Sequence, residues 1–269
     1  MNSNQSADES RATRISQAFD HGKAFIAFVT AGDPSIERSA AYVEALVDGG
    51  ADLIELGVPF SDPIAEGPVI QAADVRALQA GTTLDQVFAL AAHLRRRVSV
   101  PIVLLTYLNP IFRRGYQDFF AQCATAGVDG VIVPDLPFEE QSELLDTAHS
   151  HGVHVITLVA PTSADRIRHI AQRATGFVYV VSSMGVTGER AHISTDVAAL
   201  VDEIRRYTDT PVAVGFGIGT PEQAAAMAAV SDGVIVGSRI VSLIADNPDD
   251  TEPILRDYAA SIIAAIRQH

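Results

Sequence analysis

Residues 52–68 read Asp-Leu-Ile-Glu-Leu-Gly-Val-Pro-Phe-Ser-Asp-Pro-Ile-Ala-Glu-Gly-Pro, an apolar run that passes into a proline-rich loop. Alternate residues of a β-strand point to opposite faces, and a parallel strand packed between two layers is buried on both. Glu55 is therefore expected inside the protein. Removing a carboxyl group from water raises its pKa, which suits a general acid working near neutral pH. The competing interpretation is a carboxylate satisfied by backbone donors at a strand end.

Seven further apolar runs alternate with amphipathic segments along the chain. Within 36–47 and 119–126 the apolar residues recur at the three-to-four spacing of a helix with one buried face. Eight strand–helix units with right-handed crossovers predict an α/β protein built as a closed (β/α)8 TIM barrel. The expected strands are Ala24–Thr30, Asp52–Gly57, Pro101–Tyr107, Asp129–Pro134, His154–Ala160, Gly176–Ser182, Pro211–Gly215 and Asp232–Gly237.

A weak internal repeat supports this count. Gly50-Ala-Asp-Leu-Ile-Glu, Gly127-Val-Asp-Gly-Val-Ile and Val230-Ser-Asp-Gly-Val-Ile each place an aspartate at a strand start. A doubly wound open sheet, the alternative, would more often carry a glycine-rich turn after its first strand, where this chain has Thr30-Ala-Gly-Asp-Pro. Segments 8–20 and 252–267 predict extra N- and C-terminal helices, the first closing the barrel floor. We expect residues 1–269 to form a single domain, with 1–7 as a flexible tail.

Composition narrows the possible partners and the compartment. The chain has 269 residues, 48% of them hydrophobic, and a formal net charge of −14, which argues against nucleic acid or an anionic membrane as a partner. A bare phosphate remains possible as a ligand, because backbone amides can bind it. The first ten residues lack the basic and apolar regions of a signal peptide, and no apolar run approaches the ~18 residues of a membrane span. We therefore expect a cytoplasmic protein.

Catalytic groups of such a barrel lie in the loops after the strands. A lysine for a Schiff base and a cluster of metal-binding histidines are both missing from these loops. The single lysine, Lys23, precedes the first strand at the opposite end, so a Schiff-base mechanism is not expected. Of eight histidines only His192 falls in a carboxyl-side loop, and no metal cluster can be assembled at ligand spacing. The sequence thus predicts neither a metal nor a bound cofactor.

Glycines gather in the loops after strands six, seven and eight. These loops read Ser183-Met-Gly-Val-Thr-Gly, Gly215-Phe-Gly-Ile-Gly-Thr-Pro and Gly237-Ser238. Glycine allows close approach of the backbone to a ligand, and the free amides of a helix start attract anions. Phosphate binding after strands seven and eight is a recurrent barrel feature. The loops therefore predict a phosphate cradle, unless they are only tight turns.

Four motifs together resemble the tryptophan synthase α subunit family. They are Phe28-Val-Thr-Ala-Gly-Asp-Pro, Glu55-Leu-Gly-Val-Pro-Phe-Ser-Asp-Pro, Met184-Gly-Val-Thr-Gly and Gly215-Phe-Gly-Ile, and the match runs from about residue 10 to 268. The resemblance implies retro-aldol cleavage of indole-3-glycerol phosphate to indole and D-glyceraldehyde 3-phosphate. It also implies an α2β2 (αββα) heterotetramer, in which indole passes to a β subunit that carries the pyridoxal phosphate.

The resemblance also assigns roles to individual residues. Glu55 matches the family's acid-base residue and Tyr179 a tyrosine beside it, while Glu66 stands where the family has an aspartate facing the indole nitrogen. The remaining positions fall into two groups. Substrate contacts are implied for Phe28, Leu105, Tyr107, Thr187, Gly188, Phe216, Gly217, Gly237 and Ser238. Contacts with the β subunit are implied for Pro59, Asp62, Asn109, Phe112 and Pro137.

Three rival functions stay open at this point. The first is a stand-alone indole-3-glycerol phosphate lyase that releases indole without a β partner. The second is a catalytically weak regulatory α-like subunit, which the change to Glu66 keeps in play. The third is another sugar-phosphate barrel, such as an isomerase of histidine biosynthesis, although those enzymes use paired aspartates at other strand ends.

Overall fold

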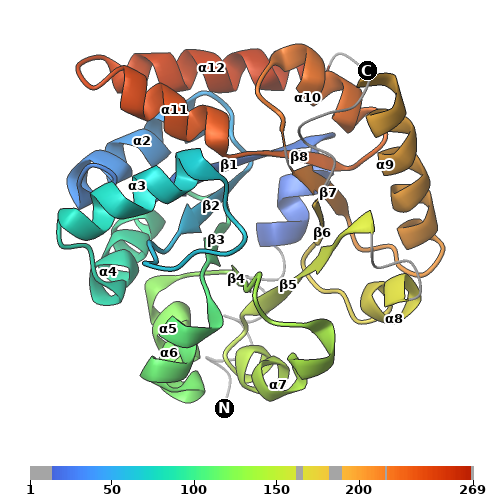
Figure 1. Cartoon of the computed structure of the whole chain (residues 1–269), viewed down its shortest axis with the longest axis horizontal. Helices are drawn as coiled ribbons and strands as arrows, with labels where there is room; N and C mark the ends of the chain where they lie inside the picture. Colours follow the sequence, from blue (N-terminus) through green and yellow to red (C-terminus); the bar gives the residue numbers. More distant parts are fainter. Residues whose placement is uncertain (1–13, 162–165, 182–189, 216, 268–269) are drawn as a thin grey trace.

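The fold is a closed barrel of eight parallel strands (Figure 1). The computed structural model describes residues 14–161, 166–181, 190–215 and 217–267. Each strand pairs with the next in sequence, and β8 closes the ring against β1. The strands are β1 (Ala24–Thr30), β2 (Leu53–Gly57), β3 (Ile102–Leu105), β4 (Gly130–Ile132), β5 (His154–Val159), β6 (Val178–Val181), β7 (Val212–Gly215) and β8 (Gly233–Val236).

Helices form the outer layer and the extra elements at the chain's ends. They are α2 (Ile36–Asp48), α3 (Pro68–Gln79), α4 (Leu84–Arg95), α5 (Leu108–Arg114), α6 (Tyr116–Ala126), α7 (Ser142–Ser150), α8 (Ile167–Ala171), α9 (Arg190–Arg205), α10 (Pro221–Ala228), α11 (Ser238–Asp246) and α12 (Thr251–Ile266), with a short 3-10 helix η1 (Phe138–Glu140). The predicted (β/α)8 barrel with additional terminal helices is thereby confirmed.

The strands match the predicted runs, and each end lies within two residues of its predicted position. One of the two-residue differences is at Tyr107, which was expected on the third strand but is the N-cap residue of α5. The cause lies in the next loop of the barrel, where the Asp135 carboxylate accepts the Leu108 backbone N–H at 2.9 Å. This hydrogen bond turns the chain into α5 and brings the Tyr107 side chain over the barrel mouth.

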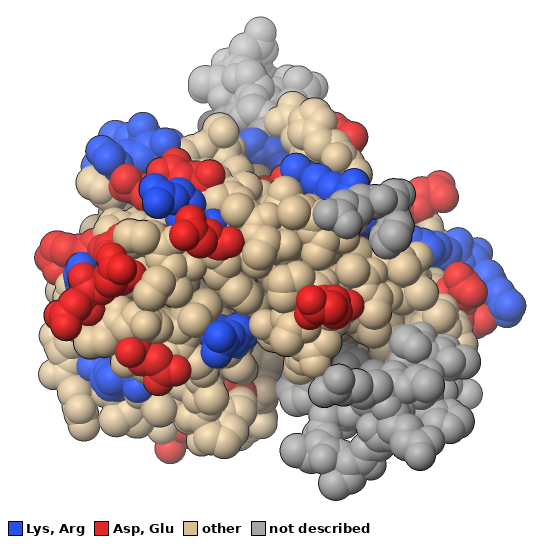
Figure 2. Space-filling view, turned by 90° about the horizontal axis from the view of Figure 1, so that it is seen from above, with Lys and Arg blue, Asp and Glu red and all other residues tan. Residues whose placement is uncertain are grey.

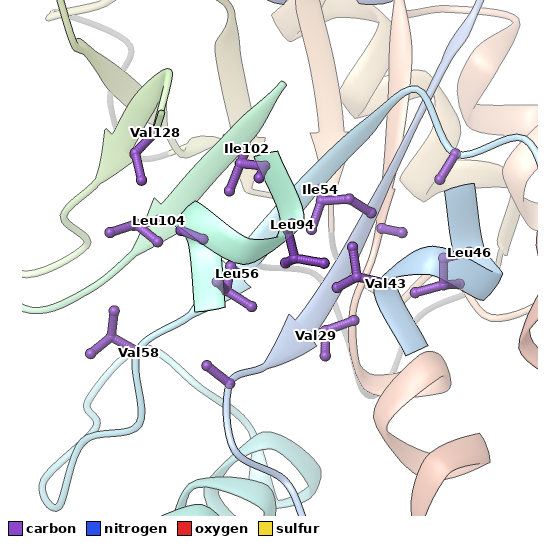
Figure 3. Close-up of a cluster of buried hydrophobic side chains, with 14 of the residues drawn as sticks. Val29, Val43, Leu46, Ile54, Leu56, Val58, Leu94, Ile102, Leu104 and Val128 are labelled. Carbon is purple, nitrogen blue, oxygen red and sulfur yellow. The ribbon is translucent and has the colours of Figure 1, made fainter. Parts of the chain in front are cut away.

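The outward faces of the strands pack against the surrounding helices. Figure 3 shows Ile54 and Leu56 of β2 beside Val43 of α2 and Leu94 of α4, all of them fully buried. Burial of each such side chain stabilises the fold by roughly 1.5–3 kcal/mol. Because these residues face outward, the alternate positions of β2, including Glu55, must face the barrel interior.

An N-terminal helix closes the amino end of the barrel. Residues 14–20 are helical, and in Figure 1 this blue segment lies within the ring of strands. Its Ile15 and Ala18 are buried in one cluster with Ile26 and Leu53 of the interior. The expected barrel floor is confirmed for the described part of segment 8–20, so the open end is the one where the strands finish.

Three aspartates that precede strands share one arrangement, and we call them the strand-start aspartates: Asp52, Asp129 and Asp232. Each accepts the backbone N–H of the preceding strand, with distances of 2.8, 2.9 and 2.8 Å from Phe25, Ile102 and Val212. Each also pairs with an arginine, and the partners are Arg267, Arg14 and Arg205. The repeat seen in the sequence is therefore a device that joins neighbouring strands at the closed end.

Among the described residues, Lys and Arg side chains are interspersed with Asp and Glu side chains on the face shown in Figure 2. No helix within the described ranges combines the length and the apolar character needed to cross a membrane.

Candidate active site

Glu55 lies in the middle of β2, inside the barrel. It is in register with Phe28 of β1 and Val103 of β3, and only 1% of its surface is exposed. Its Oε2 atom has no hydrogen-bond partner within the described residues. The backbone donors that the competing interpretation requires are therefore missing at this oxygen.

The surroundings of Glu55 favour its protonated form. Burial raises the pKa of Glu55 to about 8, and the negative charge of Glu66 adds to the effect. A carboxyl group with this pKa holds a proton at neutral pH and can exchange it with a substrate. The barrel interior thus contains a buried carboxyl group that is protonated at neutral pH.

Two aromatic rings share the interior with Glu55, and glycines make room for them. A Cβ atom at Gly57 would come within 2.6 Å of the Phe28 ring, and one at Gly215 within 2.5 Å of the Tyr179 ring. Burial raises the pKa of Tyr179 well above its ordinary value, and the charge of Glu55 raises it further. Tyr179 therefore stays protonated and lies close enough to Glu55 for the two groups to interact.

Glu66 is held at the barrel mouth by Tyr107. The Tyr107 hydroxyl donates a hydrogen bond to the Glu66 carboxylate and accepts one from the Ala65 backbone N–H at 3.0 Å. Burial raises the pKa of Glu66, while Tyr107 and two backbone N–H groups act in the opposite direction by binding the anion. The aromatic expected as a pocket wall thus also orients the second carboxylate.

Leu105 connects the barrel interior with the helices above it. Its half-buried side chain packs both against the interior residues and against the cluster of Phe28, Ala73 and Val241. Phe28, in register with Glu55, and Leu105 therefore pack in one cluster on the inner side of the barrel. Together with Tyr179 they form apolar walls around one acidic group.

Part of the predicted phosphate cradle lies within the described residues. Gly237 is the N-cap of α11 without a side-chain cap, and the exposed Ser238 is the first residue of that helix. The uncapped amides face outward at a helix start, which is the arrangement that binds anions. Gly217 adopts a left-handed backbone with φ of +70°. Thr187, Gly188 and Phe216 lie outside the described residues.

Two residues near the site were not found from the sequence. Asp74 of α3 is a carboxyl group whose burial raises its pKa to about 7, and Ile64 is 78% exposed in the loop before α3. A polar residue on the inward stripe of a helix signals the first. An isolated apolar residue in a polar loop signals the second.

Comparison with known proteins agrees with this geometry. A family model described as "Tryptophan synthase alpha chain" matches residues 16–266. Proteins of that name are 47% identical in Lacticaseibacillus casei and 51% identical in Lactiplantibacillus plantarum, with 94% of this chain and 96% of each relative covered. The chain belongs to the tryptophan synthase alpha chain family.

Solved structures show the same relationship. Tryptophan synthase subunit alpha from Legionella pneumophila superposes with a TM-score of 0.87 at 35% identity, covering 98% of this chain and 99% of that chain. A tryptophan synthase chain from Mycobacterium tuberculosis also gives 0.87 at 35% identity, with 95% and 99% covered.

Membership of the tryptophan synthase alpha chain family settles the reaction. The chain is a carbon–carbon lyase of tryptophan biosynthesis that cleaves indole-3-glycerol phosphate and forms a complex with a β subunit. The rival barrel of histidine biosynthesis is thereby excluded. The roles of individual residues stay predictions.

The five positions implied as contacts with a β subunit differ in exposure. Asp62, Asn109, Phe112 and Pro137 are all exposed, Phe112 by 69%. Pro59 differs, because it is buried. It lines a pocket of about 410 Å³ together with Asn109 and Pro110. A partner could therefore contact Pro59 only by filling this pocket.

Proposed function

We propose that Glu55 is the acid-base residue of indole-3-glycerol phosphate cleavage. The observation that carries this proposal is its burial without a partner at Oε2, together with a pKa of about 8. Protonated Glu55 transfers its proton to C3 of the indole ring, which becomes an electron-accepting indoleninium cation. The carboxylate then takes the hydroxyl proton of the adjoining glycerol carbon. The electrons of the breaking carbon–carbon bond return to the ring, and indole and the aldehyde are released with Glu55 protonated again.

Glu66 is proposed as the anion that faces the indole nitrogen. The ring carries positive charge after protonation at C3, and a fixed carboxylate beside the N–H stabilises that state more than the neutral substrate. Glutamate is longer than aspartate by about 1.3 Å. The Tyr107 hydrogen bond supports the proposal, because it gives the longer side chain a defined place.

The remaining pocket residues are proposed to bind and orient the substrate. Phe28 and Leu105 pack on the indole ring, and the Tyr179 hydroxyl lies beside Glu55 as a proton-bearing neighbour. The amides of Gly217, Gly237 and Ser238 bind the phosphate, in a cradle that Thr187, Gly188 and Phe216 complete. Because the phosphate and the ring are held at opposite ends, the bond to be broken is placed beside Glu55.

For the partner we propose an αββα heterotetramer, with the β subunit on the face formed by Asp62, Asn109, Phe112, Pro137 and the pocket at Pro59. The alpha chain itself uses no cofactor under this proposal, and pyridoxal phosphate belongs to the β subunit. The cytoplasm is the proposed compartment. Within the described residues no three metal-binding side chains lie together.

Indole release from indole-3-glycerol phosphate, followed with and without a β subunit, tests these proposals. We expect slow release by the isolated chain and strong stimulation by the partner. Fast release that the β subunit leaves unchanged would favour the stand-alone lyase. A chain that stimulates the β subunit but releases no indole would favour the regulatory subunit.

A further inference from the structure

Tyr258 of the C-terminal helix α12 contacts the loop of residues 215–220, which leads from β7 into α10. Its hydroxyl donates a hydrogen bond to the backbone carbonyl of Gly219 at 3.2 Å. Burial raises the pKa of Tyr258 to about 12, while the charge of Arg239 acts in the opposite direction, so the hydroxyl keeps its proton at neutral pH. The ring packs against the main hydrophobic cluster, and α12 packs against both α10 and α11 (Figure 1). A side chain anchored in the core therefore fixes one point of this loop.

Two further contacts hold the same loop. The Gln223 side-chain oxygen accepts the backbone N–H groups of Gly219 at 2.9 Å and of Thr220 at 3.1 Å. The Ile218 side chain is buried in the main hydrophobic cluster. Gly217, which precedes it, is exposed and has a φ of +70°. Because the three residues after Gly217 are all held, its backbone has a defined place.

The loop of residues 215–220 lies against the start of α11. A Cβ atom at Gly219 would come within 3.8 Å of the Arg239 Cβ atom, and Arg239 directly follows Ser238, the first residue of α11. The backbone that Tyr258 holds is therefore adjacent to the helix start proposed to bind the phosphate. In this way α12, which supplies no residue to the proposed pocket, contacts the loop that does.

We propose that Tyr258 is a positioning residue for phosphate binding, which holds the Gly219 carbonyl and thereby orients the Gly217 backbone toward the phosphate of the substrate. This inference rests on the proposed role of Gly217 in the phosphate cradle. Tyr258 acts only through the loop of residues 215–220. When its hydrogen bond is absent, the loop has more conformations before binding, and ordering it reduces the affinity for the phosphate.

The first test compares Tyr258→Phe with Tyr207→Phe. Each variant loses one hydroxyl that donates a hydrogen bond, but Tyr207 bonds to Glu203 at 2.9 Å, beyond the end of α9 and before β7 begins. We expect Tyr258→Phe to raise the KM for indole-3-glycerol phosphate about threefold, the effect of one hydrogen bond, with kcat little changed. The phosphate is bound in both the substrate and the transition state, so its loss appears in KM. Tyr207→Phe should leave KM unchanged.

Product inhibition by D-glyceraldehyde 3-phosphate shows at which end of the pocket the change occurs. This product carries the phosphate but not the indole ring, so its inhibition constant should also rise about threefold in Tyr258→Phe. A wild-type KM in Tyr258→Phe would overturn the proposal. An equal rise in Tyr207→Phe, or a rise in KM without one in the inhibition constant, would overturn it as well.

A second pair of variants tests the same loop through a different side chain. Gln223→Ala removes the acceptor of the Gly219 N–H and breaks the capping box at the start of α10. Gln86→Ala breaks the same kind of capping box at the start of α4, where the glutamine oxygen accepts the Thr83 N–H. Both variants lose a helix cap, but only Gln223→Ala should raise KM, by about threefold. This pair serves as the test if Tyr258→Phe does not fold, and equal KM values in the two variants would contradict the proposal.

Gly217→Ala separates a failure of this inference from a failure of the proposed cradle. If Tyr258 acts through Gly217, the KM of the double variant should be lower than the product of the two single effects predicts, whereas fully multiplied effects would refute the coupling. An unchanged KM in Gly217→Ala would contradict the role of Gly217 itself. A raised KM in Gly217→Ala with a wild-type KM in Tyr258→Phe would contradict only the role of Tyr258.

Discussion

At the closed end of the barrel the strand-start aspartates each accept a backbone N–H and pair with an arginine, whereas at the open end Glu55, Glu66 and Asp74 have no ion-pair partner among the described residues. The first arrangement joins strands through a backbone acceptor and an ion pair. The second leaves wholly or partly buried carboxyl groups without an arginine, and burial raises their pKa values. The comparison separates carboxyl groups that stabilise the fold from those proposed to take part in the reaction. Variants at the closed end should lower stability, and variants at the open end should lower turnover.

The largest effect is expected at Glu55. Glu55→Gln removes the exchangeable proton, so turnover of indole-3-glycerol phosphate should fall by about 10²–10⁴-fold. The thermal unfolding midpoint should stay the same or rise, because the variant no longer buries a group that can carry an unpaired negative charge. Indole release and a thermal melt of the same preparation check both. Wild-type turnover by Glu55→Gln would contradict the division between carboxyl groups that stabilise the fold and those that take part in the reaction.

The matching change at the closed end is Asp129→Ala. It leaves the Ile102 N–H without its acceptor and Arg14 without its partner, so the free energy of unfolding should decrease by about 3–5 kcal/mol. Turnover per folded molecule should remain near the wild-type value. Asp85→Ala, which breaks an exposed pair with Arg114, is the control and should cost less than about 1 kcal/mol. Urea unfolding measures the decrease in unfolding free energy for each variant. Equal decreases would show that the burial of Asp129 does not determine the size of the effect.

An intermediate effect is expected at Glu66. Glu66→Ala should lower kcat about a hundredfold, whereas Glu66→Asp keeps the charge but cannot reach both Tyr107 and the ring, so about a tenfold loss is expected. Tyr107→Phe removes only the hydroxyl and should resemble Glu66→Asp. Steady-state kinetics on the three variants test this order. Full activity of Glu66→Ala would rule its role out.

The pH dependence of activity and of stability tests the shifted pKa of Glu55 without a variant that greatly lowers either. Since the pKa of Glu55 is about 8, activity should fall as pH rises through 8 and the acid loses its proton. Its folded pKa lies above the ordinary value of 4.5, so its contribution to stability is complete below pH 4.5 and is lost as pH rises through 8. Unfolding free energies at several pH values should therefore show a downward slope that Glu55→Gln removes. An identical slope in both proteins would contradict the shifted pKa.

The smallest effect is expected in the phosphate cradle. Gly217 has a positive φ, and a Cβ atom there would meet nothing within 4 Å, so Gly217→Ala acts only through backbone strain. We expect KM to rise by about fivefold, equivalent to ~1 kcal/mol, with kcat little changed. Gly22→Ala, which also has a positive φ and open space but lies at the closed end, is the matched control. A change in KM of the same size in the control would show that strain in general, and not phosphate binding, is responsible.

The barrel and the inward position of Glu55 follow from period-two alternation, because a buried parallel strand leaves its side chains no other arrangement. The repeated aspartates marked the strand starts, but their pairing with arginines distant in sequence depends on how the chain closes. Tyr107 was misplaced by two residues for a similar reason, since its turn is set by Asp135 of the next loop. The place of Asp74 on the inward stripe of α3 follows from the helical period, but the upward shift of its pKa depends on how α3 packs against β1 and α11.

The most direct test of the account is the titration of Glu55 itself. In protein labelled with 13C at glutamate carboxyl carbons, the signal missing from Glu55→Gln identifies the residue, and its chemical shift can be followed from pH 4 to 10. The account predicts a midpoint near 8, and the midpoint should fall when Glu66 is replaced by alanine. A midpoint near the ordinary value of 4.5 would contradict a general acid at this position.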